Sequence, residues 1–161
     1  MKPGKAFVAG VIGAVVMSGI LWVARNVMGI PANMEMMLGT MVVPNAALTA
    51  WLVGFAMHAL IGGVIALVYA WGFEHITHRS GWVVGAAFGL AHAVISGLGM
   101  GMIPAIHPMI PERLPAPGMF MANLGAIGIV AEFALHAVYG AIIGALYGPV
   151  TGERAPQPVT A

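Results

Sequence analysis

Histidines inside long apolar stretches are the residues of this sequence that could do chemistry. His58, His92 and His136 each fall near the centre of an apolar run. Ionisable side chains at such positions are costly to bury, and they usually face the interior of a helix bundle. An imidazole nitrogen can hold a haem iron or a metal ion, and it can also carry a proton.

One carboxylate accompanies these histidines. Glu132 precedes His136 by four residues, so a helix places both side chains on one face. A carboxylate in that position can orient a ligating imidazole, bind a metal directly or transfer a proton. Glu132 is the only acidic residue well inside an apolar run, and the chain contains no Asp and no Cys. The candidate cofactor-binding residues are therefore His58, His92, His136 and Glu132.

Two of the histidines belong to a segment that occurs twice. Residues 55–62 (FAMHALIG) resemble residues 133–140 (FALHAVYG), at an offset of 78 without a gap. We interpret the chain as a tandem duplication of a two-helix unit, covering residues 1–78 and then 79–150. Because each unit contains an even number of spans, both would enter the membrane from the same side. A pseudo-twofold axis along the membrane normal would relate them.

The duplication predicts a special relation between His58 and His136. It places them at equal depth on symmetry-related helices, where both imidazoles could ligate the iron of haem b. Neighbouring glycines would leave room for the macrocycle. Three other interpretations remain open: a metal ion such as copper held together with His92 and Glu132, a proton or quinone site, and histidines that only hydrogen-bond between helices.

Methionines concentrate around the connections expected on the outer side. The sequence has 13 methionines, and ten flank these connections. Thioether sulfur is a soft ligand that selects Cu(I), and a histidine in the second connection could add an imidazole. Methionine is also an adaptable apolar filler that suits contact with a partner. The candidate metal-ligating residues are Met34, Met36, Met100, Met102, Met119, Met121 and His107.

Long apolar runs must position these residues. Of the 161 residues, 60% are hydrophobic and only 7% are charged, too few charges to cover a water-exposed surface. A helix that crosses the hydrocarbon core needs about 20 apolar residues. The gaps between charges predict four such helices, at 5–28, 45–72, 81–103 and 121–148. The sequence therefore predicts an all-α integral membrane protein, a bundle of four transmembrane helices.

Small residues recur at every fourth position on the second helix of each unit. This spacing lets helix backbones approach closely in lipid. We expect two small-residue ridges to mediate helix packing: Gly62, Ala66 and Ala70 in the first unit, and Gly140, Gly144 and Gly148 in the second.

The few basic residues indicate an orientation. They are commoner on the side of the two termini (Lys2, Lys5, Arg79, Arg154) than on the other side (Arg25, Arg113). Because Lys and Arg accumulate on the cytoplasmic side, we expect a multi-pass protein of the cell (inner) membrane with both termini in the cytoplasm. The polar, proline-containing tail 151–161 is expected to be disordered.

Several classes of function are excluded. The net charge of +1 offers no basic surface for nucleic acid. The sequence has no phosphate-binding glycine loop, no metalloprotease motif and no credible Ser/His/Asp set, so we expect no enzyme that acts on its own.

Three hypotheses of function remain. The first is a membrane protein that binds haem b or copper through its central histidines. Such a protein could serve as an electron-transfer or accessory subunit. The second is an accessory subunit of a larger membrane complex, with structural histidines. The third is a small carrier or channel that acts as an oligomer. The expected partners are the lipid bilayer and either other membrane subunits or a second copy of the chain.

Overall fold

The computed structural model describes residues 1–151, and all regular structure within them is helical. Four helices are long and apolar enough to cross a membrane, as the gaps between charges predict. They are α1 (Pro3–Met28), α3 (Leu48–Gly72), α4 (Trp82–Met100) and α6 (Ala126–Tyr147). Of the tail that we expected to be disordered, only Thr151 is described, so that prediction lies outside the described residues.

The helix ends follow local backbone chemistry. α1 begins at Pro3, where the first turn does not need the missing N–H, and ends at Gly29, whose φ of 71° suits a left-handed cap. α6 begins later than the predicted span, because a separate 3-10 helix (η2, Met119–Leu124) precedes it and Gly125 has a φ of 77°. α3 continues into one π-helical turn (η1, Phe73–Thr77).

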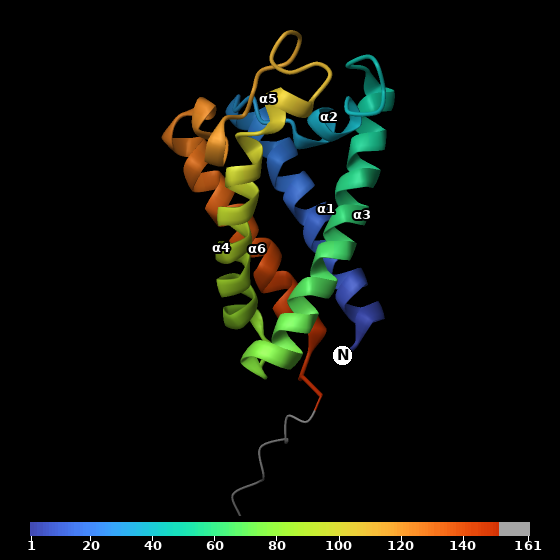
Figure 1. The fold of residues 1–161 in the computed structure, drawn as a ribbon, viewed down its shortest axis with the longest axis vertical. Helices are drawn as coiled ribbons and strands as arrows, with labels where there is room; N and C mark the ends of the chain where they lie inside the picture. Colours follow the sequence, from blue (N-terminus) through green and yellow to red (C-terminus); the bar gives the residue numbers. More distant parts are fainter. Residues whose placement is uncertain (152–161) are drawn as a thin grey trace, which may run out of the picture.

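The four long helices run along the long axis of the molecule (Figure 1). The N-terminus and the end of α6 lie at the lower end of this view, and the short helices α2 (Met34–Gly39) and α5 (Ile103–Ile106) lie at the upper end. α1 packs mainly on α3, α4 packs mainly on α6, and the two hairpins meet where α6 contacts α1. The predicted duplication relates α3 to α6, which touch only sparsely. Contact between helices does not test such a relation, so the tandem repeat stays a prediction.

Small residues bring the paired helices into backbone contact. A Cβ atom on Gly140 would lie 2.1 Å from the carbonyl oxygen of Gly85. A Cβ atom on Gly10 would lie 2.3 Å from the carbonyl oxygen of Gly62. Real Cβ atoms do not come so close to a carbonyl oxygen, so only glycine fits these crossings. Gly62 and Gly140, which belong to the two predicted small-residue ridges, therefore both lie at helix contacts.

The connection between α1 and α3 (residues 29–47, the first outer connection) folds back against the bundle. Asn33 caps α2 by accepting a hydrogen bond from the Met36 N–H, at 3.1 Å. α2 then lies against the start of α3 so closely that a Cβ atom on Gly39 would be 1.7 Å from the Ala50 oxygen. The connection between α4 and α6 (residues 101–125, the second outer connection) contains α5 and η2. The upper end of the bundle is therefore covered by folded segments.

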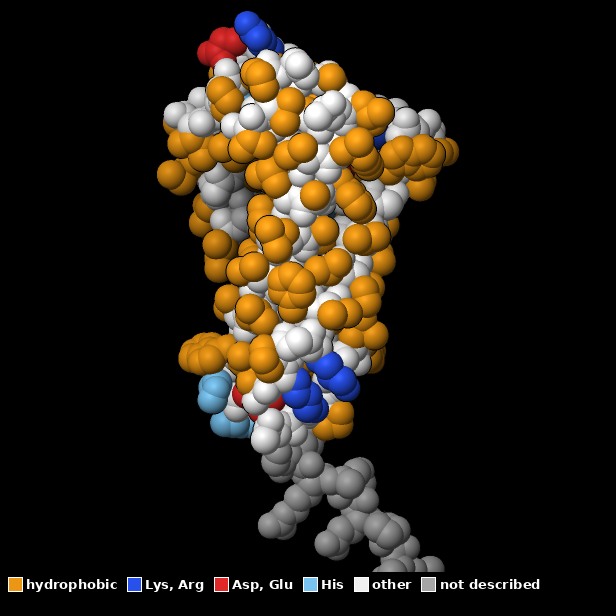
Figure 2. Space-filling view, turned by 90° about the vertical axis from the view of Figure 1, so that its right-hand side faces the viewer, with side chains coloured by type: hydrophobic (Ala, Val, Ile, Leu, Met, Phe, Trp, Pro, Cys, Tyr) orange, Lys and Arg blue, Asp and Glu red, His pale blue; other side chains and the backbone are white. Residues whose placement is uncertain are grey.

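Apolar side chains cover the face of the molecule that Figure 2 shows, between its two ends. Basic and histidine side chains gather at the lower end, and further charged side chains lie at the upper tip. Large apolar residues such as Val68 and Ile95 are exposed on the helices between these ends. The surface therefore has an apolar band bounded by two charged ends.

Glu74 ties the lower end together. Its carboxylate accepts hydrogen bonds from the Tyr147 hydroxyl at 2.5 Å and from the Thr151 N–H at 2.9 Å. The ammonium group of Met1 lies 3.6 Å from the same carboxylate. One side chain thus joins the N-terminus, the turn after α3 and the residues after α6.

Candidate functional site

A cavity of about 470 Å³ lies in the upper half of the bundle. Its walls come from α1, α3 and α6, from α2 with the residues before it, and from the second outer connection with η2. A cavity of this size can hold a small organic molecule or a cofactor. Most lining side chains are apolar, and the polar exceptions are Arg25, Asn33, His58, Glu132 and His136.

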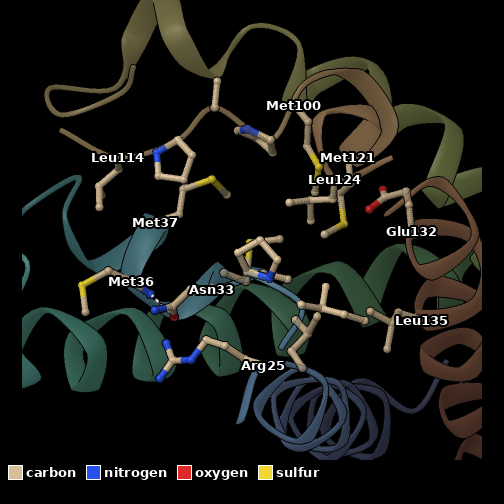
Figure 3. A pocket seen from close by; sticks show the side chains of 18 of the residues that line it. Arg25, Asn33, Met36, Met37, Met100, Leu114, Met121, Leu124, Glu132 and Leu135 are labelled. Atoms are coloured by element: carbon tan, nitrogen blue, oxygen red, sulfur yellow. Dashed lines mark hydrogen bonds between the residues drawn. The ribbon is translucent and has the colours of Figure 1, made fainter. Parts of the chain in front are cut away.

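The charged groups of the cavity lie apart. Figure 3 shows Glu132 reaching into the cavity from α6, with Met100 and Met121 beside it in this view. Arg25 and Asn33 lie on the other side of the same view. The cavity therefore has an acidic part and a basic part, separated by apolar side chains.

The ring of His136 is held by its own helix. Its Nδ1 lies 2.8 Å from the backbone oxygen of Glu132, so Nδ1 carries the proton and donates this bond. Nε2 makes no hydrogen bond with any of residues 1–151. Because a hydrogen bond at one ring nitrogen fixes the tautomer and the ring orientation, Nε2 of His136 is available as a ligand.

His58 on α3 is anchored by a hydroxyl group of α1, which can either donate or accept. The Ser18 Oγ lies 2.9 Å from the Nδ1 of His58. Within the described part of the chain, the Nε2 of His58 also lacks a hydrogen-bond partner. The structure thus brings His58 and His136 to one cavity, with an Nε2 on each ring that no described residue occupies. The Nε2 of His58 can act as a ligand in the tautomer whose Nδ1–H donates to the Ser18 Oγ.

Glu132 carries an unsatisfied oxygen. The residue is 1% exposed, and its Oε1 has no hydrogen-bond partner among the described residues. This atom lies 3.5 Å from the Nδ1 of His136, and Ser96 on α4 interacts with the carboxyl group. A buried polar atom without a partner costs about 1–3 kcal/mol. A ligand with a hydrogen-bond donor or a positive charge would remove this cost.

His92 on α4 contacts the site but does not line the cavity. Its ring packs edge-on against that of His136, with centroids 4.7 Å apart. The Tyr69 hydroxyl lies 3.1 Å from the Nδ1 of His92. The structure therefore places His92 behind His136, where its ring packs against the imidazole of His136.

The methionines of the predicted metal site divide into two groups. Met34, Met36, Met100 and Met121 line the cavity together with Met17 and Met37, which the sequence did not single out. Met102 and Met119 are 65% and 55% exposed, and neither lines the cavity. The cavity therefore combines part of the methionine cluster with the central histidines, two features that the sequence presented separately.

His107 has a structural environment. Its Nδ1 accepts a hydrogen bond from the Met109 N–H at 3.0 Å. Its Nε2 therefore carries the proton, and it lies 2.9 Å from the Met37 oxygen and 3.3 Å from the Thr40 Oγ1. Because both ring nitrogens are occupied, His107 fastens the second outer connection to α2.

Within residues 1–151, no three histidine or carboxylate side chains form a group that could hold a metal ion. The predicted set of His58, His92, His136 and Glu132 is therefore not gathered as the ligands of one bare ion.

Three polar residues of the site were not predicted. Ser18 anchors His58, while Arg25 and Asn33 line the cavity near the upper end. A signal for Ser18 was present, because the 78-residue offset that relates the histidines also aligns Ser18 with Ser96. No pattern in the sequence points to Arg25 or Asn33.

The chain belongs to a family of unknown function (DUF6789), whose sequence pattern matches residues 1–157. No curated protein and no solved structure matches the chain.

Proposed function

We propose that the protein is an integral membrane protein that binds haem b in the cavity, with the imidazoles of His58 and His136 as ligands. One observation carries this proposal: the two rings line the same apolar cavity, each held at Nδ1 by a neighbouring group and each with an Nε2 that no described residue occupies. Haem proteins commonly hold iron through such imidazole nitrogens. When bound, haem would supply one-electron chemistry, which no side chain of this cysteine-free cavity offers.

The membrane setting is supported by the surface. Four helices are long and apolar enough to span a bilayer, and an apolar band lies between charged ends (Figure 2). The start of α1 and the turn between α3 and α4 lie at the lower end (Figure 1), and Lys2, Lys5 and Arg79 belong to these segments. Arg25 belongs to the last turn of α1 and Arg113 to the segment after α5, at the upper end. Because basic residues accumulate on the cytoplasmic side, we place the lower end in the cytoplasm and the cavity in the outer half of the inner membrane.

The size and chemistry of the cavity favour haem over a bare ion. Ligand pockets for organic molecules have volumes of about 300–1,000 Å³, and this one has about 470 Å³. The described residues hold no group of three histidine or carboxylate ligands. An apolar macrocycle also suits walls built mostly from methionine, leucine and proline.

The chain contributes orientation and the exclusion of water. The Glu132 carbonyl and the His92 ring fix His136, while Ser18 fixes His58. Met100 and Met121 shield the same region from solvent, since they are buried to 5% and 7% exposure. Rings fixed in this way would bind iron with a smaller entropic cost than freely rotating side chains.

A haem titration of the detergent-purified chain tests the proposal. We expect the sharp, shifted Soret band of imidazole-ligated haem for the unchanged chain, and only the band of haem in detergent alone for the double variant His58→Ala/His136→Ala. Each single variant should bind at least about tenfold more weakly, which is the loss typical of removing even a partner of a metal ligand. His75→Ala is the matched control, because His75 is exposed in the turn after α3.

Two results would contradict haem binding. One is an unchanged chain that leaves the Soret band of haem in detergent unshifted. The other is a double variant whose band matches that of His75→Ala, because the cavity histidines would then not be the ligands.

A second candidate is Cu(I), and the six methionines that line the cavity favour it. Thioether and imidazole ligands both suit this ion. Metal analysis of the same samples distinguishes the two candidates. Copper that is bound by the haem-free chain and lost in Met100→Leu/Met121→Leu would assign the cavity to copper.

A further inference from the structure

Arg25 is a cation without a counter-ion at the edge of the cavity. It lies in the last turn of α1, it is half-buried, and it lines the cavity. Its guanidinium group forms no hydrogen bond or ion pair with any residue between 1 and 151. A guanidinium group offers several N–H donors in a planar fork that matches a carboxylate. Arg25 therefore presents unused donors to whatever occupies the cavity.

Asn33 supplies a further donor on the same side of the cavity. Its Oδ1 is occupied, because it accepts the α2 capping bond from the Met36 N–H at 3.1 Å. That bond fixes the orientation of the amide, and its Nδ2 donates no hydrogen bond to the described residues. Figure 3 shows Asn33 and Arg25 on one side of the cavity, with Met36 near both in this view. Met36 also shares a shallow hollow with Arg25.

The charge pattern of the lining favours an anion at this place. Glu132 is the only carboxylate in the cavity lining, and Figure 3 shows it on the side away from Arg25. A half-buried charge in apolar surroundings is stabilised when it is paired and hydrogen-bonded. Within the described chain, Arg25 has no such partner, so a ligand can provide one.

The position of Arg25 also suits the shape of an amphipathic cofactor. Arg25 lies three residues before the end of α1, where the apolar run meets the folded outer segments. Carboxylates lose least hydration at such an interface, whereas they are costly at the bilayer centre. An apolar body directed towards the histidines with carboxylates at the interface therefore matches the lining. Haem b has this form, because its propionates leave one edge of the macrocycle.

We infer that Arg25 and Asn33 form an anion subsite that binds the carboxylates of the cofactor held in this cavity. The inference rests on the proposed haem binding, and it deepens that proposal by assigning the direction of the ligand. Arg25 pairs with a carboxylate, and the Asn33 amide donates a second hydrogen bond. The subsite distinguishes a porphyrin with free acid groups from one whose acid groups are masked.

The test compares haem b with its dimethyl ester, which has the same macrocycle and iron but no carboxylate charge. Charge-assisted hydrogen bonds contribute enough that the unchanged chain should bind the free acid about tenfold or more tightly than the ester. Arg25→Gln should remove most of this preference by weakening free-acid binding alone. Arg25→Lys should keep part of it, because a point charge remains. Arg113→Gln is the control, since Arg113 is exposed and lines a different hollow.

The outcomes separate the subsite from the function. Equal affinity for acid and ester in the unchanged chain, with tight binding of both, would refute the subsite and leave haem binding standing. An equal loss in Arg113→Gln and Arg25→Gln would also refute it, because the effect would come from the general field of the outer surface. If neither porphyrin binds, the haem proposal and the subsite both fail.

Discussion

The lower and upper halves of the bundle use the same helices in opposite ways. In the lower half, backbones touch: a Cβ atom on Gly144 would lie 2.2 Å from the Gly81 oxygen. Aromatic rings fill the remaining space there, with centroids 5.3 to 6.3 Å apart among Tyr69, Phe73, Phe88, Tyr139 and Tyr147. In the upper half, α6 instead carries Glu132 and Leu135 into a cavity of about 470 Å³.

The contrast explains why a small bundle can contain a cavity. Helices that cross at an angle approach most closely at one place and diverge away from it. Between the long helices, the crossings at Gly10, Gly140 and Gly144 put that place in the lower half, so space opens between α1, α3 and α6 in the upper half. α2 and the second outer connection then cover this space. The close helix crossings in the lower half therefore make room for the cavity in the upper half.

Gly140→Ala should have the largest effect on this arrangement. The new Cβ atom would meet the Gly85 oxygen at 2.1 Å, and both atoms belong to backbone that cannot move alone. We expect a loss of about 1–3 kcal/mol in the free energy of unfolding, measured in detergent. Gly99→Ala is the control, because a Cβ atom there meets nothing within 4 Å and alanine favours a helix. Equal stability of the two variants would show that the lower half is not tightly closed.

Glu132→Met should act in the opposite direction. It replaces the carboxyl group whose Oε1 lacks a partner in the described chain with an apolar group of similar length. We expect the ligand-free protein to gain about 1 kcal/mol in the free energy of unfolding. Glu112→Met, at an exposed position, should change little. A clear destabilisation by Glu132→Met would mean that the carboxyl group is satisfied without a ligand.

Leu135→Phe should have the smallest effect on stability. Leu135 lines the cavity, so a larger ring has space to occupy. We expect a change below about 1 kcal/mol, whereas overpacking a filled core costs about 1–3 kcal/mol. Haem binding should nevertheless weaken, because the ring takes part of the volume. A loss of stability as large as that of Gly140→Ala would indicate that the upper half is as filled as the lower half.

The sequence predicted the four long helices because apolar length between charges depends on local composition alone. It did not predict that α2 packs against α3. That contact depends on Gly39, which has no side chain and so lets its backbone approach the Ala50 backbone. It also extended α6 too far towards the N-terminus. The glycines that separate η2 from α6 interrupt the helix without interrupting the apolar run.

For the candidate site, the position of each histidine along its helix could be predicted, but the rotation of the helix about its axis could not. His58, His92 and His136 were all expected near the bundle centre, but packing turns His92 towards Tyr69 and away from the cavity. The methionine pairs show the same limit. Residues two apart on a helix point about 200° apart, so Met100 can line the cavity while Met102, just past the end of α4, is exposed.

The contact at Glu74 also means that the two ends of the described chain meet. The ammonium group of Met1 lies 3.4 Å from the Thr151 Oγ1, so a short linker could connect residues 1 and 151 in a chain shortened to the described residues. The chain could then be opened near Ser80, in the connection between the hairpins. Such a circular permutant would make α4 and α6 before α1 and α3 and would keep every helix contact. The described chain can therefore be regarded as two hairpins whose order along the sequence is interchangeable, so either hairpin could be synthesised first.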